Sequence, residues 1–391
     1  MRGLSSPYNG FWRKWCKIQH VGMSGRASLA YREHQTLEAT VLLRDMYRDV
    51  AGYQTDVQRF AASVVLCISY GRRAASMQDE AVVFNVNAIN EFQRAPGKYL
   101  VDAWPLLLWL PRPLQWFRHE ADRKRTEDSK FYLSLVQEVR QRMDAGKAKE
   151  SMTSRALQSG YEGLSDIELA YVLAAPFGAG VDTVFAAMLF YSKTQKAQAE
   201  LDRVVGRDRL PTFEDMVTLP YVGAYIKELE RWRPVVPLAV PHSVIRDDDF
   251  EGYQIPKGTT VYANIYTMAQ DSKMFPDPDE FRPERFLPRD DGTLDARFRD
   301  FTLPFGFGRR QCPGMHVASQ SIYIFVTRLL WAFDVVAEPG SPPPDSKAYI
   351  NHGLVRGPAS FRFALRPRSP ESLKVLELEA VEADIRLKEW D

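Results

Sequence analysis

One cysteine lies between glycines in the stretch Phe305-Gly306-Phe307-Gly308-Arg309-Arg310-Gln311-Cys312-Pro313-Gly314. Two arginines precede it, and an apolar run typical of a helix begins near Met315. Cationic neighbours and a helix N-terminus favour the thiolate form of a cysteine, which is the form that ligates metals. Gly308 and Gly314 allow tight turns and a close approach to a flat ligand. A lone cysteine in such a turn is more often buried and inert, so the surrounding pattern has to decide.

That pattern is Phe-x-x-Gly-x-Arg-x-Cys-x-Gly, and the sequence meets it at every fixed position. It resembles the haem-binding signature of the cytochrome P450 family. The resemblance implies haem b as the cofactor, with the Cys312 thiolate as axial ligand of the iron, an arrangement that favours O–O cleavage. It also implies that further residues of the stretch contact the haem, namely Phe305, Gly308, Arg310 and Gly314.

Composition excludes several other kinds of protein. The chain has 391 residues, 45% of them hydrophobic, so it can bury a large core. A net charge of +1 gives no general attraction to nucleic acid. The three cysteines, Cys16, Cys67 and Cys312, are widely spaced and form no Cys-x-x-Cys pair. This spacing excludes a zinc ribbon and a c-type haem attachment, disfavours a disulfide framework, and predicts reduced thiols that face the cytosol.

An apolar stretch from Ala170 to Tyr191 contains a second motif, and Asp182 is its only charged residue. Hydropathy alone would allow a membrane span. One proline and two glycines beside an acid favour instead a core helix that lines a cavity. Ser165 and Glu168 predict a capping box at its start, and Pro176 predicts a kink before the motif.

The second motif is the adjacent acid and alcohol Asp182-Thr183. A threonine hydroxyl can donate to a preceding carbonyl, and a buried carboxylate needs a partner. The pair resembles the oxygen-activation motif of the same family, which implies that it delivers protons during catalysis. The segment from Asp182 to Gln195 is about two helical turns shorter than is usual in the family.

A third motif is Glu-x-x-Arg at Glu228 and Arg231, which share one helix face. As an exposed pair it would contribute only about 0–1 kcal/mol. The resemblance implies instead a buried network with Arg285, from the run Pro283-Glu284-Arg285-Phe286, that fixes the cysteine loop.

Two further contacts to haem propionates are predicted. The helix around Trp12 carries donors, and by resemblance Trp12 contacts a propionate. Cys16 occupies the family's arginine position, so Arg13 or Lys17 would substitute; a solvated basic helix face is the alternative. His242 lies where the family places a cationic propionate contact, and a surface histidine is the alternative.

The remaining chain predicts a mainly α protein with a small β region. Three prolines break Leu100–Phe117 into short pieces, which either touch a membrane, roof a substrate pocket or pack on the core. The only clear strand signals lie between Val236 and Ile265, and Phe361–Leu365 is expected to form a last strand. Residues 1–368 are expected to form one domain. The charged tail 369–391 carries Leu378, Val381 and Ile385 at helical spacing, and it is expected to be either a short helix or a disordered end.

The resemblance reaches from the Trp12 helix to about Arg368 and looks most like fungal members of specialised metabolism. It implies a monooxygenase that inserts one atom of dioxygen into a small apolar or aromatic substrate, with electrons from NADPH through a cytochrome P450 reductase. About a hundred N-terminal residues, including the family's membrane anchor and first strands, are expected to be absent. The family resemblance implies the endoplasmic reticulum membrane, whereas the missing anchor favours a cytosolic or peripheral protein. Two alternatives remain, a truncated inactive homologue and a haem-thiolate isomerase or synthase, and Thr183 argues against the latter.

Overall fold

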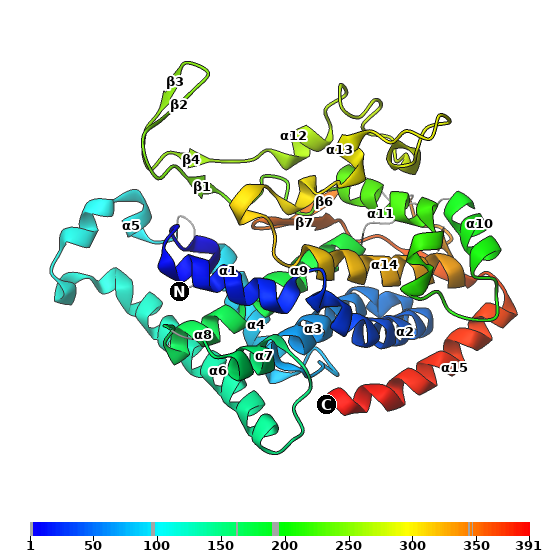
Figure 1. Ribbon diagram of the computed structural model, residues 1–391, viewed down its shortest axis with the longest axis horizontal. Helices are drawn as coiled ribbons and strands as arrows, with labels where there is room; N and C mark the ends of the chain where they lie inside the picture. Colours follow the sequence, from blue (N-terminus) through cyan, green and yellow to red (C-terminus); the bar gives the residue numbers. More distant parts are fainter. Residues whose placement is uncertain (1–2, 95–97, 162, 190–194, 343–344, 346) are drawn as a thin grey trace. The chain divides into compact units, whose positions relative to one another are not determined.

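The computed structural model describes residues 3–94, 98–161, 163–189, 195–342, 345 and 347–391. Within them the chain is mostly helical, with four small two-stranded antiparallel sheets (Figure 1), which confirms the predicted fold class. Contacts divide the chain into two compact units. Unit 1 comprises Met1–Phe185, Pro313–Ser321 and Glu377–Asp391, and unit 2 comprises Ala186–Cys312 and Ile322–Leu376.

Unit 1 is a set of helices whose apolar faces pack on one another, α2 on α3 and α6 on α8. Its helices are α1 (Gly10–Met23), α2 (Arg32–Arg48), α3 (Tyr53–Tyr70), α4 (Glu80–Arg94), α6 (His119–Asp144), α7 (Met152–Ser159), α8 (Asp166–Leu173) and the greater part of α9 (Ala175–Met188). Ser151 and Ser154 form a capping box at the start of α7, and the buried Met152 anchors the first turn.

The apolar stretch forms α8 and α9, with a break at Ala174 between them. This break confirms the kink that Pro176 predicted, because proline has no N–H to donate to the preceding turn. The predicted capping box is also present, since Ser165 N–H donates to Glu168 Oε2 at 2.8 Å and Glu168 N–H donates to Ser165 Oγ at 3.3 Å. Among the described residues Asp166–Met188 is long and apolar enough to cross a membrane. Because 61% of its most apolar window is buried, the core-helix prediction fits better.

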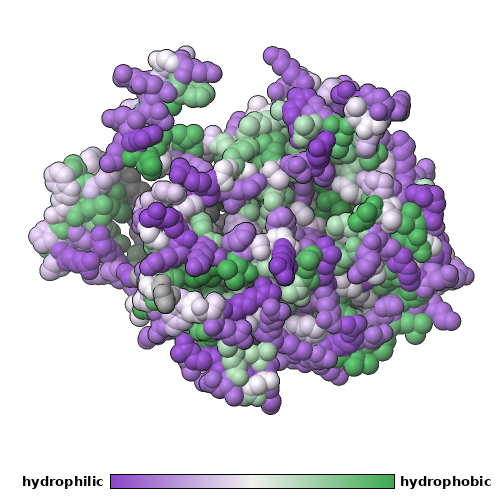
Figure 2. Space-filling view, viewed as in Figure 1, coloured by the Kyte–Doolittle hydropathy of each residue, from purple (hydrophilic) through white to green (hydrophobic). Residues whose placement is uncertain are grey.

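The proline-broken segment after Leu100 forms short helical pieces, as predicted: α5 (Leu100–Ala103), then the 3₁₀ helices η4 (Pro105–Trp109), η5 (Arg112–Leu114) and η6 (Trp116–Arg118). Its large side chains are exposed, Trp109 to 85% and Trp104 to 64%. Packing on the core, one of the three alternatives, is therefore excluded for these two side chains. Figure 2 shows apolar side chains gathered over this part of the surface.

Unit 2 combines short helices with the four small sheets. Its helices are α10 (Gln195–Val204), α11 (Pro220–Trp232), α12 (Ile265–Ala269) and α13 (Ala296–Arg299). The strand pairs are β1 (His242–Ser243) with β4 (Thr260–Val261), β2 (Asp248–Phe250) with β3 (Tyr253–Ile255), β5 (Phe333–Ala337) with β8 (Phe363–Pro367), and β6 (Tyr349–His352) with β7 (Val355–Pro358). The last strand expected at Phe361–Leu365 corresponds to β8, whereas β5, β6 and β7 were not predicted. Helix α14 (Met315–Ala332) has residues in both units.

The C-terminal tail is a helix, α15 (Pro370–Leu387), followed by the 3₁₀ turn η11 (Lys388–Trp390). The helical alternative is therefore confirmed. The apolar residues noticed in the sequence, Leu378, Val381 and Ile385, are 57–62% exposed. The buried face is instead formed by Leu376, Ala380, Ala383 and Leu387.

Candidate functional site

The cysteine loop of unit 2 has a closed backbone. The 3₁₀ turn η9 (Leu303–Phe305) ends at Gly306, and a second turn, η10 (Gly308–Arg310), precedes the cysteine. Cys312 N–H donates to the Phe305 carbonyl at 2.8 Å and so closes the loop. Gly306 and Gly308 have φ angles of +78° and +55°, which other residues adopt only with strain. The sequence predicted tight turns at Gly308 and Gly314. The backbone angle confirms this at Gly308, whereas Gly306 was not predicted and Gly314 is not among the glycines of positive φ.

The loop leaves its cysteine open to a ligand. Of the three cysteines, all within the described residues, Cys67 is buried, Cys16 is half-buried and Cys312 is exposed. A Cβ added at Gly306 or Gly308 would meet nothing within 4 Å, so there is open space beside the loop. Arg310, two residues before the cysteine, is half-buried. An exposed sulfur, an arginine two residues before it and open space beside the glycines of the loop fit haem, an anionic and flat iron cofactor.

A buried ionic network lies upstream of this loop. Glu228 and Arg231 on α11 have fully buried side chains, and Arg231 donates to both carboxylate oxygens at 2.7 and 2.9 Å. Arg285, on the 3₁₀ turn η8 (Pro283–Phe286), adds a contact of 3.3 Å to Glu228. The backbone N–H of Arg282 donates to the same carboxylate at 2.8 Å. The predicted network is confirmed, and the exposed-pair alternative is wrong.

The two arginines also hold main-chain carbonyls of the segment between α12 and η8. Arg231 donates to the carbonyls of Ala269 and Pro278 at 2.7 and 2.9 Å. Arg285 donates to the carbonyls of Pro276 and Asp277. Burial lowers the pKa of Arg285, and Glu228 opposes that shift. One carboxylate and two guanidiniums thus order a loop that has little regular structure of its own.

An aromatic cluster connects this network to the cysteine loop. Phe275, over which the Arg231 guanidinium lies at 5.2 Å, packs with Phe286 and Phe301. The ring centroids of Phe286 and Phe301 are 5.0 Å apart. Leu303, which begins η9, packs against the same cluster. This cluster was not predicted from the sequence; the phenylalanine that ends the Pro-Glu-Arg-Phe run was the available signal.

Asp182 and Thr183 occupy one turn of α9 in unit 1, and both are half-buried. Thr183 Oγ1 donates to the Ala179 carbonyl at 2.8 Å, the back-bond that the sequence predicted. Asp182 is less enclosed than the sequence analysis assumed. Ala179 is exposed, so this turn of the helix reaches an open face. Gly180 lies against α3, because a Cβ there would lie 2.4 Å from Val65 Cγ1. Residues 190–194 of the segment expected to be short lie outside the described residues.

The predicted propionate contacts differ in exposure. Trp12 is 5% exposed on α1, where its ring lies 4.9 Å from that of Tyr8. Arg13 and Lys17 on the same helix are exposed. His242 is exposed on β1, paired with Val261. Contact of Trp12 and His242 with a cofactor remains a prediction.

Comparison with known proteins identifies the class. A family model described as Cytochrome P450 matches residues 10–364. The chain belongs to the cytochrome P450 family and is a monooxygenase-type oxidoreductase. Members of this family bind haem iron through a cysteine thiolate and generally take electrons from a redox partner.

The curated relatives are fungal. Cytochrome P450 monooxygenase 58 of Postia placenta is 35% identical over 94% of this chain and 74% of its own length. A cytochrome P450 monooxygenase of Armillaria gallica is 34% identical over 95% of this chain and 75% of its own. Cytochrome P450 monooxygenase polD of Polytolypa hystricis is 33% identical over 97% of this chain and 76% of its own.

Proposed function

We propose that this enzyme inserts one oxygen atom from dioxygen into a C–H bond of a small apolar or aromatic metabolite, in fungal secondary metabolism. The observation that carries the proposal is the exposed Cys312 in a closed glycine loop. Its redox partner is an NADPH-dependent cytochrome P450 reductase, and residues 1–368 act as one catalytic domain. The protein contacts the endoplasmic reticulum membrane peripherally, and the exposed Trp104 and Trp109 side chains support this.

The cysteine loop holds the cofactor. Cys312 Sγ would ligate the haem iron, Phe305, Gly308 and Gly314 would let the backbone approach the ring, and the Arg310 guanidinium would neutralise a propionate. His242 and Trp12 would donate to the propionates. Haem, when bound, supplies the activation of dioxygen. The protein supplies orientation, charge and protons.

Thr183 and Asp182 move protons. Because the Thr183 hydroxyl donates to the Ala179 carbonyl, its lone pairs can accept a hydrogen bond from a protonated group in the site. The half-buried Asp182 carboxyl takes up a proton from solvent and returns it to the group that has given up its proton there. An isomerase or synthase has no need of this relay, so Asp182 and Thr183 favour the monooxygenase over that alternative.

Oxygen-18 labelling tests the proposal. Compounds that shift the absorption spectrum of the enzyme are incubated with reductase, NADPH and ¹⁸O₂, and the products are weighed by mass spectrometry. We expect one oxygen-18 atom in the product. A bound compound that is rearranged without NADPH, and that takes up no label, would establish the isomerase alternative instead.

A further inference from the structure

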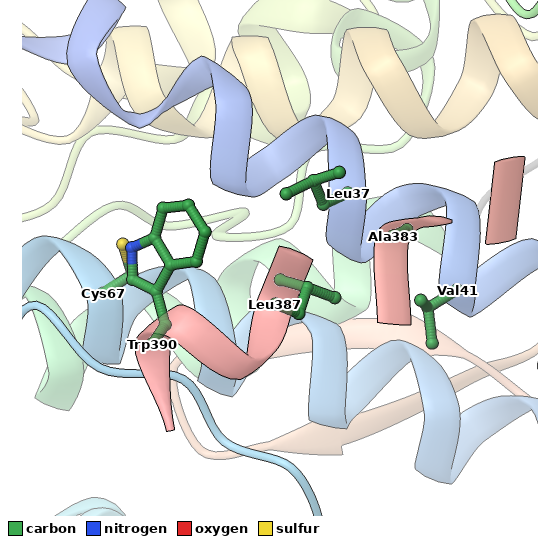
Figure 3. Close-up of a cluster of buried hydrophobic side chains, with 6 residues drawn as sticks. All are labelled: Leu37, Val41, Cys67, Ala383, Leu387 and Trp390. Atoms are coloured by element: carbon green, nitrogen blue, oxygen red, sulfur yellow. The ribbon is translucent and has the colours of Figure 1, made fainter. Parts of the chain in front are cut away.

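The end of the chain covers a buried charged cluster in unit 1. Trp390, in the turn η11, packs with Cys67 of α3 and with Leu37 and Leu387 (Figure 3). Its ring centroid lies 5.4 Å from that of His34, and its carbonyl accepts from Arg73 N–H at 2.8 Å. This segment lies beyond residue 364, where the match to the family model ends.

The cluster under Trp390 is centred on Glu38, whose side chain is fully buried. Arg59 lies 2.7 Å and Arg73 lies 3.1 Å from its carboxylate. Ser63 Oγ also donates to Glu38, at 2.7 Å. Two cations therefore already face one buried anion, with the Asp391 carboxylate 3.8 Å from Arg73 as a second, more exposed anion.

These bonds determine the protonation state of His34. Because the Ser63 hydroxyl proton is donated to Glu38, Ser63 Oγ can only accept from His34 Nε2, which lies at 3.2 Å. His34 is thus neutral with its proton on Nε2. Its Nδ1 is buried and has no hydrogen-bond partner within the described part of the chain. A second proton would go to Nδ1, where no described acceptor exists and where Arg59 and Arg73 already lie nearby. Burial accordingly lowers the pKa of His34 to about 4.

The segment Glu377–Asp391 contacts the rest of unit 1 through ion pairs near the surface and apolar side chains beneath them. Arg44 pairs with Asp384, Arg48 with Glu377, and Arg386 with Glu33. Near the end of the chain, Lys149 lies 2.6 Å from Glu389 and 4.8 Å from the centre of the Trp390 ring. Beneath these contacts the Trp390 ring, 9% exposed, lies beside His34, which is 2% exposed.

We infer that the segment Glu377–Asp391 is an acid-sensitive latch, which protonation of His34 releases by detaching Trp390 from α2 and α3. The sign follows from linkage. The pKa of His34 is lower when the latch is closed than it would be when the latch is open. Neutral His34 therefore stabilises the closed state above the ordinary histidine pKa, and this stabilisation is lost as the pH falls below that value. Glu38 attracts the incoming proton, whereas Arg59 and Arg73 repel it.

Cys67 provides the readout, because its thiol is buried in the cluster with Trp390 and should become accessible when the latch opens. The protein is labelled with a dithiodipyridine, which reacts with thiols in acid as well as at neutral pH. Labelling of Cys67 is followed by peptide mass spectrometry and divided by its rate in the urea-unfolded chain at the same pH. From about pH 7.5 to about pH 5 we expect this ratio to rise by up to roughly thirtyfold, while circular dichroism shows the helices intact.

Three variants distinguish opening of the latch from a general loss of stability of the fold. His34→Gln keeps a donor toward Ser63 but does not titrate, so its labelling ratio should stay low at both pH values. Trp390→Ala should be labelled fast at both. Leu378→Ala, on the exposed face of α15, should behave as the parent protein. The inference would be overturned if the labelling ratio of the parent protein did not change with pH, or if the rise persisted in His34→Gln. It would also be overturned if the ratio rose only at pH values where circular dichroism shows unfolding.

Discussion

Glu228→Gln removes one negative charge from the centre of the network on α11 and keeps the shape of the side chain. In the folded protein the Glu228 carboxylate faces the guanidiniums of Arg231 and Arg285 at 2.7 and 3.3 Å. The side chains of Glu228 and Arg231 have no exposed surface, so water cannot solvate the arginine charge once the carboxylate is removed. Breaking one partner of a buried ion pair costs about 3–5 kcal/mol, because the remaining charge is left buried without compensation.

Urea unfolding followed by circular dichroism measures this cost. Glu284→Gln is the matched control, since Glu284 on η8 pairs with Lys196 at 2.5 Å but both side chains are partly exposed. That pair should contribute only about 0–1 kcal/mol. Glu228→Gln should therefore unfold at a clearly lower urea concentration than Glu284→Gln and should retain less haem. Equal midpoints for the two variants would refute the claim that the network is a buried anchor of the cysteine loop.

Three further outcomes follow from single contacts. Thr183→Ala should lower the product formed per NADPH by roughly a hundredfold and raise hydrogen peroxide, because the relay hydroxyl is lost; unchanged coupling would contradict the relay. Gly180→Ala should cost about 1–3 kcal/mol in urea unfolding, because its Cβ would lie 2.4 Å from a side-chain carbon of α3, whereas Gly223→Ala meets nothing and should be neutral or stabilising. Arg209 holds the pKa of the Asp215 carboxyl below its ordinary value, so this carboxylate stabilises the fold above that value and stops doing so as the pH falls. Asp215→Asn should therefore lose less stability below about pH 4 than the parent, and an identical acid profile would exclude this contribution.

The sequence predicted those parts of the site that depend on local spacing. The cysteine turn follows from the glycines around Cys312, and the back-bond of Thr183 follows from its place in an apolar helix. Partners distant in the sequence were predicted only through the family resemblance. From spacing alone, Glu228 and Arg231 were expected to form an exposed pair. Burial of that helix face depends on Phe275 and Phe301, which come from other segments of the chain.

The tail shows why the rest could not be predicted. Leu378, Val381 and Ile385 have a regular helical spacing, yet the helix buries the face that carries Ala380 and Ala383. Small side chains permit close packing, while a hydropathy pattern gives them little weight. Charged partners on α2 then decide which face turns inward. Neither effect can be read from α15 alone.

In the proposed function Cys312 holds haem iron as a thiolate. The absorption spectrum of the purified, reduced protein with carbon monoxide tests this directly. We expect a strongly red-shifted Soret band that is absent in Cys312→Ala and unchanged in Cys16→Ala. A parent protein without haem, a band typical of a neutral axial ligand, or a red-shifted band that survives Cys312→Ala would contradict it.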